Sequence, residues 1–181
     1  MTGDKVNRVI FVIAFRDFRD PEYFIPKQIL EEGGVEVKTA SDKKGLAIGA
    51  EGGEAEIDFL VSEVAAEEFD GVIFVGGPGC LDHLDNDESY ELARETVQKE
   101  KLLASICISP VILAKAGVLE GKKATVWSSE MNKQGVKKIK EQGAEYLDEP
   151  VVEDEGIITA CGPSAAKRFG ELVLSVLTEN S

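Results

Sequence analysis

Short strand-like runs alternate with helical segments along this chain, and that alternation restricts its fold more than any other sequence feature. The strand-like runs cover residues 8–14, 35–40, 71–75, 102–106 and 123–127. Helical patterns cover residues 21–32, 87–100, 110–117, 130–142 and 165–178, and hairpins are predicted over 45–58 and 151–160. Strands that alternate with helices form a mainly parallel sheet covered on both faces. We therefore predict an α/β protein with a three-layer sandwich.

Length and charge narrow the class of protein further. A chain of 181 residues predicts one domain, residues 1–181. The 34 acidic residues exceed the 20 basic ones, and the net charge of −14 argues against nucleic acid or an anionic membrane as partner. Three cysteines cannot all be paired, no apolar run reaches transmembrane length, and the first residues show no signal-peptide core. These features predict a reduced, cytoplasmic protein.

The most informative single position is Cys107, where the strand-like run 102–106 ends. Ser109 follows in an N-cap position and Pro110 suits the first turn of a helix, so the cysteine lies at a strand-to-helix corner. Backbone N–H groups and the helix dipole favour a thiolate at such a corner. The interpretation is a nucleophile or an oxidation sensor. A buried, inert cysteine is the alternative, since free cysteine is among the most buried residue types.

A glycine pair, Gly76 and Gly77, directly follows the strand-like run 71–75. Glycines let the backbone turn sharply and present bare N–H groups, and one such group together with the N–H of Ile108 would form an oxyanion hole. A tight turn needed only for topology is the alternative. The surrounding residues do not match a phosphate-binding loop, and the first strand lacks the glycines of a dinucleotide fingerprint.

Gly76 and three further side chains are candidates for a pocket around this cysteine. Glu22 opens the first helix and would exchange a proton with a thiol, or would simply complement the helix dipole. His83 is the only histidine; it is the one available imidazole partner, or a surface residue. Trp127 walls the pocket or fills the core. Cys80 and Cys161 are interpreted as incidental thiols, and no zinc-ligand spacing or cofactor motif is found.

Four segments of the chain resemble the ThiJ/PfpI superfamily, the small flavodoxin-like relatives of class I glutamine amidotransferases. They cover residues 18–22, 72–77, 104–107, and 148–152 with 157–163, and the resemblance extends from about residue 8 to residue 177. It implies a flavodoxin-like fold, and a homodimer or larger homo-oligomer. It also implies Cys107 in a nucleophile elbow, Glu22 as its hydrogen-bonded acid, and an oxyanion hole formed by the N–H groups of Gly77 and Ile108.

The family's activities include glyoxal hydration, deglycation, proteolysis and chaperoning, and this sequence departs from its protease-like members. Those members carry histidine directly after the cysteine, where Ile108 stands here, and no histidine follows His83. Without an imidazole, protonation of an amine leaving group is difficult, whereas attack on an aldehyde expels no amine. Glu31 and Glu32 replace basic residues of some relatives, which would disfavour strongly anionic substrates if those positions lie near the pocket.

We therefore expect a cysteine-dependent hydrolase or lyase of the glyoxalase or deglycase type. Its substrate would be a small-molecule carbonyl, and no cofactor, metal, nucleic acid or membrane is expected. A redox-sensing or chaperone-like protein without turnover and an intracellular cysteine peptidase are the two alternatives.

Overall fold

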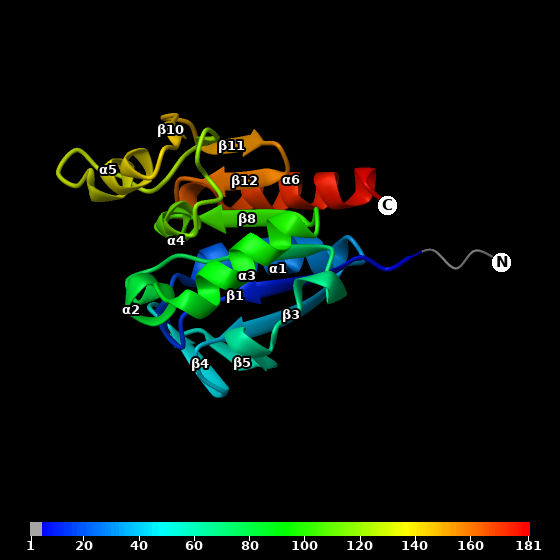
Figure 1. The fold of residues 1–181 in the computed structure, drawn as a ribbon. Helices are drawn as coiled ribbons and strands as arrows, with labels where there is room; N and C mark the ends of the chain where they lie inside the picture. The colour runs from blue at the N-terminus through cyan, green and yellow to red at the C-terminus, as the bar shows by residue number, and fades with distance from the viewer. Residues whose placement is uncertain (1–4) are drawn as a thin grey trace.

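A seven-stranded sheet forms the centre of the computed structural model, which describes residues 5–181 (Figure 1). The strand order is β11 (Val151–Asp154), β12 (Ile157–Ala160), β8 (Leu102–Ile106), β7 (Gly71–Phe74), β1 (Arg8–Val12), β3 (Glu36–Ser41) and β6 (Phe59–Leu60). Every neighbouring pair is parallel except β11 and β12, which form the predicted hairpin. The predicted α/β fold with a mainly parallel sheet is confirmed.

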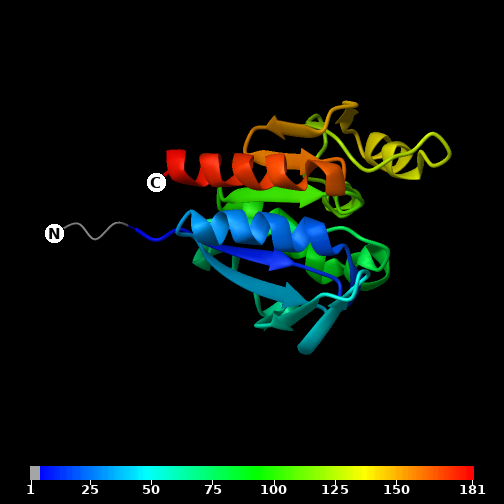
Figure 2. The same cartoon turned by 180° about the vertical axis from the view of Figure 1, so that it is seen from behind.

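Helices cover both faces of this sheet because successive residues of each central strand point to opposite sides. In β1, Val9 and Phe11 pack in the core beneath α1 (Asp20–Glu32) and α6 (Ala166–Glu179), which lie side by side in Figure 2. Ile10 and Val12 pack in the second core, beneath α3 (Asp87–Gln98) and α4 (Pro110–Lys115). The short α2 (Cys80–Leu84) lies beside α3 at one end of the sheet (Figure 1).

Smaller elements surround the main sheet. The predicted hairpin is formed by β4 (Gly45–Gly49) and β5 (Glu54–Ile57), and β2 (Arg16–Phe18) adds an unpredicted third strand to it. β9 (Lys123–Ala124) pairs with β10 (Glu145–Tyr146), and 3₁₀ turns occupy Val61–Glu63, Ala66–Glu68 and Pro163–Ala165.

Several predicted elements are one or two residues shorter in the structure, and two are much shorter. The predicted strand 123–127 has regular pairing only over β9. The backbone beyond it is held by individual bonds: the Thr125 N–H donates to the Thr159 hydroxyl, 2.9 Å away, and the Trp127 N–H donates to the Cys107 carbonyl. The predicted helix 130–142 is reduced to α5 (Gln134–Glu141), because the chain around Asn132 forms a turn whose side chain accepts the Gln134 N–H at 3.0 Å.

The carboxyl ends of β1, β7 and β8 meet at one end of the sheet. The chain leaves β1 toward β3 on one side, and β7 lies on its other side, so the strand order reverses between β1 and β7. Ligands of open α/β sheets bind in the crevice at such a reversal. Within residues 5–181, no helix has both the length and the apolar character required to cross a bilayer.

Candidate active site

Cys107 lies at a sharp corner between β8 and α4, as predicted. Its φ angle of +66° lies in the left-handed region, which is strained for a residue with a side chain. Two bonds hold this conformation: its N–H donates to the Ala160 carbonyl at 2.9 Å, and its carbonyl accepts the Trp127 N–H at 2.7 Å. The residue retains 8% exposure. Cys107 therefore lies at the end of a buried strand and keeps a small exposed area on a cavity.

The Ser109 hydroxyl does not cap α4, contrary to the sequence-based expectation. It is fully buried, and its Oγ lies 2.8 Å from both the Ser105 Oγ and the Ile106 carbonyl oxygen and 3.0 Å from the Phe74 carbonyl oxygen. It also accepts the Ile106 N–H at 3.1 Å. Ser109 therefore braces the end of β8 against β7, and α4, with six residues, starts without a side-chain cap.

Glu22 lies in the first turn of α1 and points into the protein, where its side chain is fully buried. Its carboxyl group is close to the Cys107 thiol and to the Gly76 N–H, and hydrogen bonding to both lowers its pKa. Neither oxygen, however, has a partner with full hydrogen-bond geometry. Burial is the larger effect and raises the pKa of Glu22 to about 8. Glu22 is therefore a carboxyl group that titrates near neutral pH beside a thiol.

The electrostatics of Cys107 differ from the expectation of a thiolate favoured by the helix. Burial raises the pKa of the Cys107 thiol, and the charge of ionised Glu22 raises it further, whereas the Ile108 N–H acts in the opposite direction. When ionised, Glu22 is positioned to accept the proton of this thiol.

The two predicted oxyanion donors lie on the cavity beside Cys107. The Ile108 N–H points at the sulfur, and within residues 5–181 no acceptor is found for the Gly77 N–H. Gly77 has a φ of +123°, and a β-carbon there would lie 2.4 Å from the Arg19 nitrogen. The backbone of β7 therefore reaches the site only because this residue is glycine.

A cavity of about 520 Å³ opens over this corner of the sheet. Cys107, Gly77, Ile108 and Trp127 line it, whereas Glu22 is buried beneath it. Gly76, which was predicted as a pocket residue, is also buried and does not line the cavity, because it lies between Glu22 and Cys107. His83 does not line the cavity: its Nδ1 lies 2.7 Å from the Asp42 carboxylate. The sequence-based placement of His83 in the pocket therefore receives no support from the geometry.

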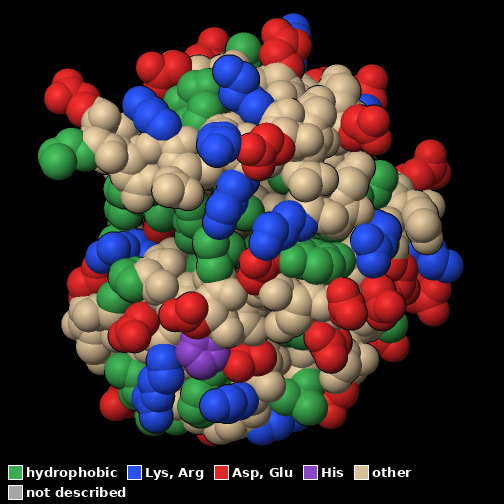
Figure 3. Space-filling model, turned by 60° about the vertical axis from the view of Figure 1, so that its left-hand side comes forward, with side chains coloured by type: hydrophobic (Ala, Val, Ile, Leu, Met, Phe, Trp, Pro, Cys, Tyr) green, Lys and Arg blue, Asp and Glu red, His purple; other side chains and the backbone are tan. Residues whose placement is uncertain are grey.

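Two cations on the cavity wall have no counterpart in the sequence-based prediction. Arg19 lines it from the start of α1 and Lys138 from α5. In Figure 3, basic side chains gather across the middle of the face that carries α5. Glu31 and Glu32 lie at the far end of α1, outside the cavity. The condition under which they would disfavour anionic substrates is therefore not met, because they do not reach the site.

A second cavity, of about 480 Å³, lies at the amino ends of β7, β8 and β12. Asp70, Leu102 and Ile157 are among its lining residues, and it contains none of the predicted site residues. Within the described part of the chain, no cluster of three or more histidine, cysteine, aspartate or glutamate side chains could bind a metal ion.

The chain passes from strand β8 into helix α4 at Cys107, whose φ angle is positive, and a buried acid and backbone N–H groups lie beside it. This arrangement is a nucleophile elbow in an α/β protein. The chain belongs to the DJ-1/PfpI family, whose model matches residues 7–176.

Individual relatives agree with this assignment. The chain is 37% identical over 178 residues to an uncharacterized protein of Methanocaldococcus jannaschii, covering 98% of this chain and 85% of that protein. It is 32% identical over 157 residues to the protein named deglycase PfpI of Pyrococcus furiosus, covering 86% and 90%. The crystal structure of a ThiJ/PfpI domain protein from Brachyspira murdochii superposes with a TM-score of 0.91 at 37% identity, covering 98% of this chain and 99% of that one.

Proposed function

We propose that the protein is a cysteine-dependent enzyme that converts small reactive carbonyl compounds, of the glyoxalase or deglycase type. The observation that carries this proposal is the buried Glu22 carboxyl, with a pKa of about 8, beside the Cys107 thiol beneath an open cavity. Perturbed acids of this kind next to a nucleophile are typical of active sites. Relatives named deglycases, at 30–32% identity in Escherichia coli and Pyrococcus furiosus, support the same class of reaction.

The first step is attack of the Cys107 sulfur on the aldehyde carbon. Ionised Glu22 accepts the thiol proton while the carbon–sulfur bond forms, and the carbonyl electron pair moves to oxygen. The N–H groups of Gly77 and Ile108 stabilise that oxyanion, and Glu22 then returns the proton to it, which leaves a hemithioacetal. A carboxyl group with a pKa near the working pH suits both directions of this transfer.

With an α-oxoaldehyde the hemithioacetal proceeds to a 2-hydroxy acid. Glu22 removes the proton from the carbon bound to sulfur, and the resulting enediol is reprotonated at the adjacent carbon to form a thioester. Water then cleaves the thioester and restores the thiol. The sum is addition of one water molecule to the oxoaldehyde, so no external oxidant or reductant is required.

Peptide hydrolysis, the third expectation from the sequence, finds less support at this site. An amine leaving group needs a proton donor such as imidazole, and His83 is paired with Asp42 outside the cavity. One relative, from Bacillus subtilis, is named a putative cysteine protease. A casein assay that compares the protein with Cys107→Ala tests this reading, since contaminating protease would act equally in both samples.

The central test is the conversion of methylglyoxal to lactate by the purified protein. Cys107→Ser should abolish lactate formation, because a serine hydroxyl is a much weaker nucleophile at this pH. Cys161→Ser is the matched control, since Cys161 is a free thiol outside the cavity lining. Equal activity of the wild type and Cys107→Ser, or no activity above buffer, would refute the proposal.

A redox-responsive role without turnover is favoured by one observation of its own. Cys107 alone among the three cysteines both lines the cavity and adjoins a buried acid, while Cys80 is fully buried. Protonated Glu22 would donate a hydrogen bond to an oxygen of a sulfinate on Cys107. Mass spectrometry after mild peroxide treatment should find oxidation first at Cys107. Oxidation of all three cysteines to the same extent would contradict this role.

A further inference from the structure

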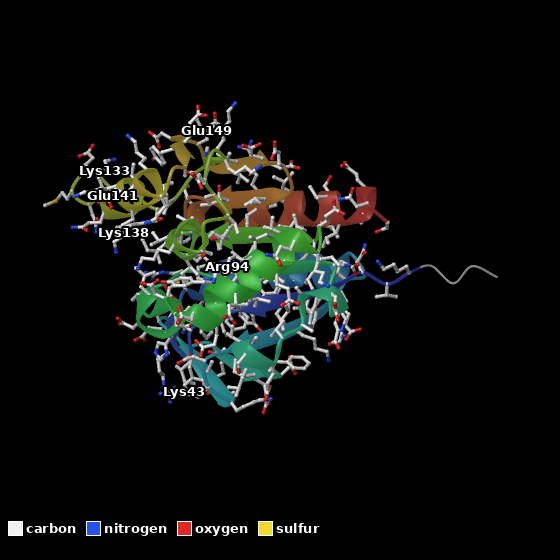
Figure 4. The ribbon with its side chains drawn as sticks, in the orientation of Figure 1. Lys43, Arg94, Lys133, Lys138, Glu141 and Glu149 are labelled. Carbon is white, nitrogen blue, oxygen red and sulfur yellow. The ribbon has the colours of Figure 1, made fainter. Side chains whose placement is uncertain are left out.

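Lys138 is a half-buried cation on the wall of the Cys107 cavity. Within residues 5–181 its ammonium group has no carboxylate within ion-pair distance, whereas its neighbour Lys137 pairs with Glu141 at 3.8 Å. Figure 4 places Lys138 on the side of α5 that is directed toward α4 and α2. A lysine in this setting supplies a positive charge that the protein itself does not neutralise.

The other charged groups of the cavity leave Lys138 as its main source of positive potential. Arg19 forms an ion pair with Glu51, and this contact lowers the pKa of Glu51 to about 2, so the two charges cancel across the working pH range. Asp82 is the only acid on the cavity lining. It is exposed to solvent, which screens its charge more than that of the half-buried lysine.

Gly135, about one helical turn before Lys138, sets the position of Lys138 relative to Cys107 because it allows α5 to approach the elbow closely. A β-carbon at Gly135 would lie 3.1 Å from the Trp127 carbonyl oxygen and 3.3 Å from the Ile108 Cδ1. Gly135 therefore lets α5 pack directly on the elbow. Residues three positions apart share a helix face, so Lys138 projects from the face of α5 that packs against the site.

We propose that Lys138 binds an anionic group of the substrate while the substrate's aldehyde carbon lies at Cys107. This inference rests on the proposed function and deepens it: the substrate class becomes α-oxoaldehydes that carry a carboxylate or a phosphate monoester. The cavity, at about 520 Å³, falls within the range for ligands well beyond three carbons. Lysine binds either anion as a point charge.

Three substrates that share one reacting group test this preference. Methylglyoxal is neutral, 4,5-dioxopentanoate adds a carboxylate, and hydroxypyruvaldehyde phosphate adds a phosphate monoester. In Lys138→Met, the ratio of kcat/KM for the preferred anionic substrate to that for methylglyoxal should fall about tenfold, as for loss of a charge-assisted hydrogen bond. If the ratio falls for 4,5-dioxopentanoate, Lys138 binds a carboxylate; if it falls for hydroxypyruvaldehyde phosphate, Lys138 binds a phosphate monoester. Unchanged ratios in both arms would overturn the proposal.

Lys140→Met is the matched control, because Lys140 lies on the same helix but is exposed and outside the cavity lining. It should keep the wild-type ratios. Asp82→Asn should raise the ratio for the anion that Lys138→Met disfavours, because it removes the opposing charge. If Lys140→Met lowered the ratio as much as Lys138→Met, the effect would come from net charge and the proposal would fail.

A second measurement does not depend on turnover. Iodoacetate and iodoacetamide alkylate a thiol by the same displacement of iodide but differ in charge. The rate of alkylation of Cys107 by iodoacetate, divided by that by iodoacetamide, is followed by mass spectrometry at low salt. This ratio should fall severalfold in Lys138→Met and keep its wild-type value in Lys140→Met. A ratio that is equal in all three proteins would overturn the inference about Lys138. Absence of methylglyoxal turnover would instead refute the proposed function.

Discussion

The carboxyl group of Glu22 and the side chain of Cys107 lie on the two sides of one glycine. A β-carbon on Gly76 would be 3.1 Å from the Glu22 Oε2 and 2.6 Å from the Cys107 Cβ. Any side chain at this position would separate the acid from the thiol. Glu22 is fully buried beside the thiol, which itself lines the cavity, and the pH-dependent predictions follow from that arrangement.

The rate of carbonyl conversion should rise with pH up to about 8. Burial raises the pKa of Glu22 to about 8, so below that pH the carboxyl is mostly protonated and cannot accept the thiol proton. Lactate formation from methylglyoxal, measured from pH 6 to 9, should show kcat/KM decreasing about tenfold per pH unit below this pKa. Glu22→Gln should lower the rate at least about 100-fold and remove the inflection. A flat wild-type profile would contradict the role of Glu22.

Glu22 should also make folding stability depend on pH. Burial raises its pKa from the ordinary 4.5 to about 8 in the folded protein, so its contribution to stability is fully present below pH 4.5 and is lost as pH rises through 8. Glu22→Gln is neutral at every pH. Between pH 5 and pH 8 it should therefore gain on the order of 3–5 kcal/mol relative to wild type.

Urea unfolding of both proteins at the two pH values measures this difference. Groups remote from Glu22 titrate alike in both proteins and cancel in the comparison, and the thiol of Cys107 stays protonated over this range because burial raises its pKa. A stability difference that is the same at pH 5 and pH 8 would show that Glu22 titrates as an ordinary exposed carboxyl.

Substitution of Gly77 should damage the oxyanion hole. An added β-carbon would lie 2.4 Å from the Arg19 nitrogen, and φ is +123°, so Gly77→Ala must displace the loop and its N–H group. Loss of one such donor costs about 100–1000-fold in kcat. Gly52→Ala is a control for backbone strain alone, since Gly52 has a φ of +91° and no atom within 4 Å of an added β-carbon. Equal activity losses in the two variants would argue against a donor role for Gly77.

His83 should be dispensable for the reaction. Its ring pairs with Asp42 at 2.7 Å and does not line the cavity. His83→Gln should retain wild-type kcat/KM for methylglyoxal and lose at most about 1 kcal/mol of stability, as for a partly exposed ion pair. A loss of activity as large as that of Cys107→Ser would show that the His83 imidazole takes part in the reaction, and would favour the cysteine peptidase hypothesis again.

Much of the fold was predictable from local patterns. The strand-like runs mark the buried strands, and the hairpin at residues 151–160 was predicted from its turn at Glu155 and Gly156, both of which have positive φ angles. The strand β2 was missed because Arg16–Phe18 has no apolar pattern of its own and pairs only with a hairpin distant in the sequence. Residues 125–127 were overpredicted as strand because their partners are single groups, not a ladder.

The candidate site was predictable where the chain itself carries the geometry. Cys107 and Ser109 share one corner, and Gly77 directly follows β7. The proximity of Glu22 was expected from the family resemblance and depends on the contact between the start of α1 and the loop after β7, where the Arg19 N–H donates to the Gly76 carbonyl at 3.0 Å. No local signal marked Lys138, because only the packing of Gly135 on Trp127 and Ile108 directs it to the cavity. The direction of the Cys107 pKa shift was missed for a related reason, since burial depends on the whole fold.

Because α5 packs on the elbow, the reacting groups and one wall of the cavity come from different parts of this small protein. In the proposed reaction, the reacting groups follow the ends of β7 and β8 or lie at the start of α1, whereas one wall of the cavity belongs to α5, whose side chains take no part in bond making. Under this proposal, exchanging residues on that wall would alter which molecules bind while the reactive centre stays intact. Replacement of the single residue Lys138 on α5 is thus the shortest route by which a descendant of this chain would acquire a different substrate preference.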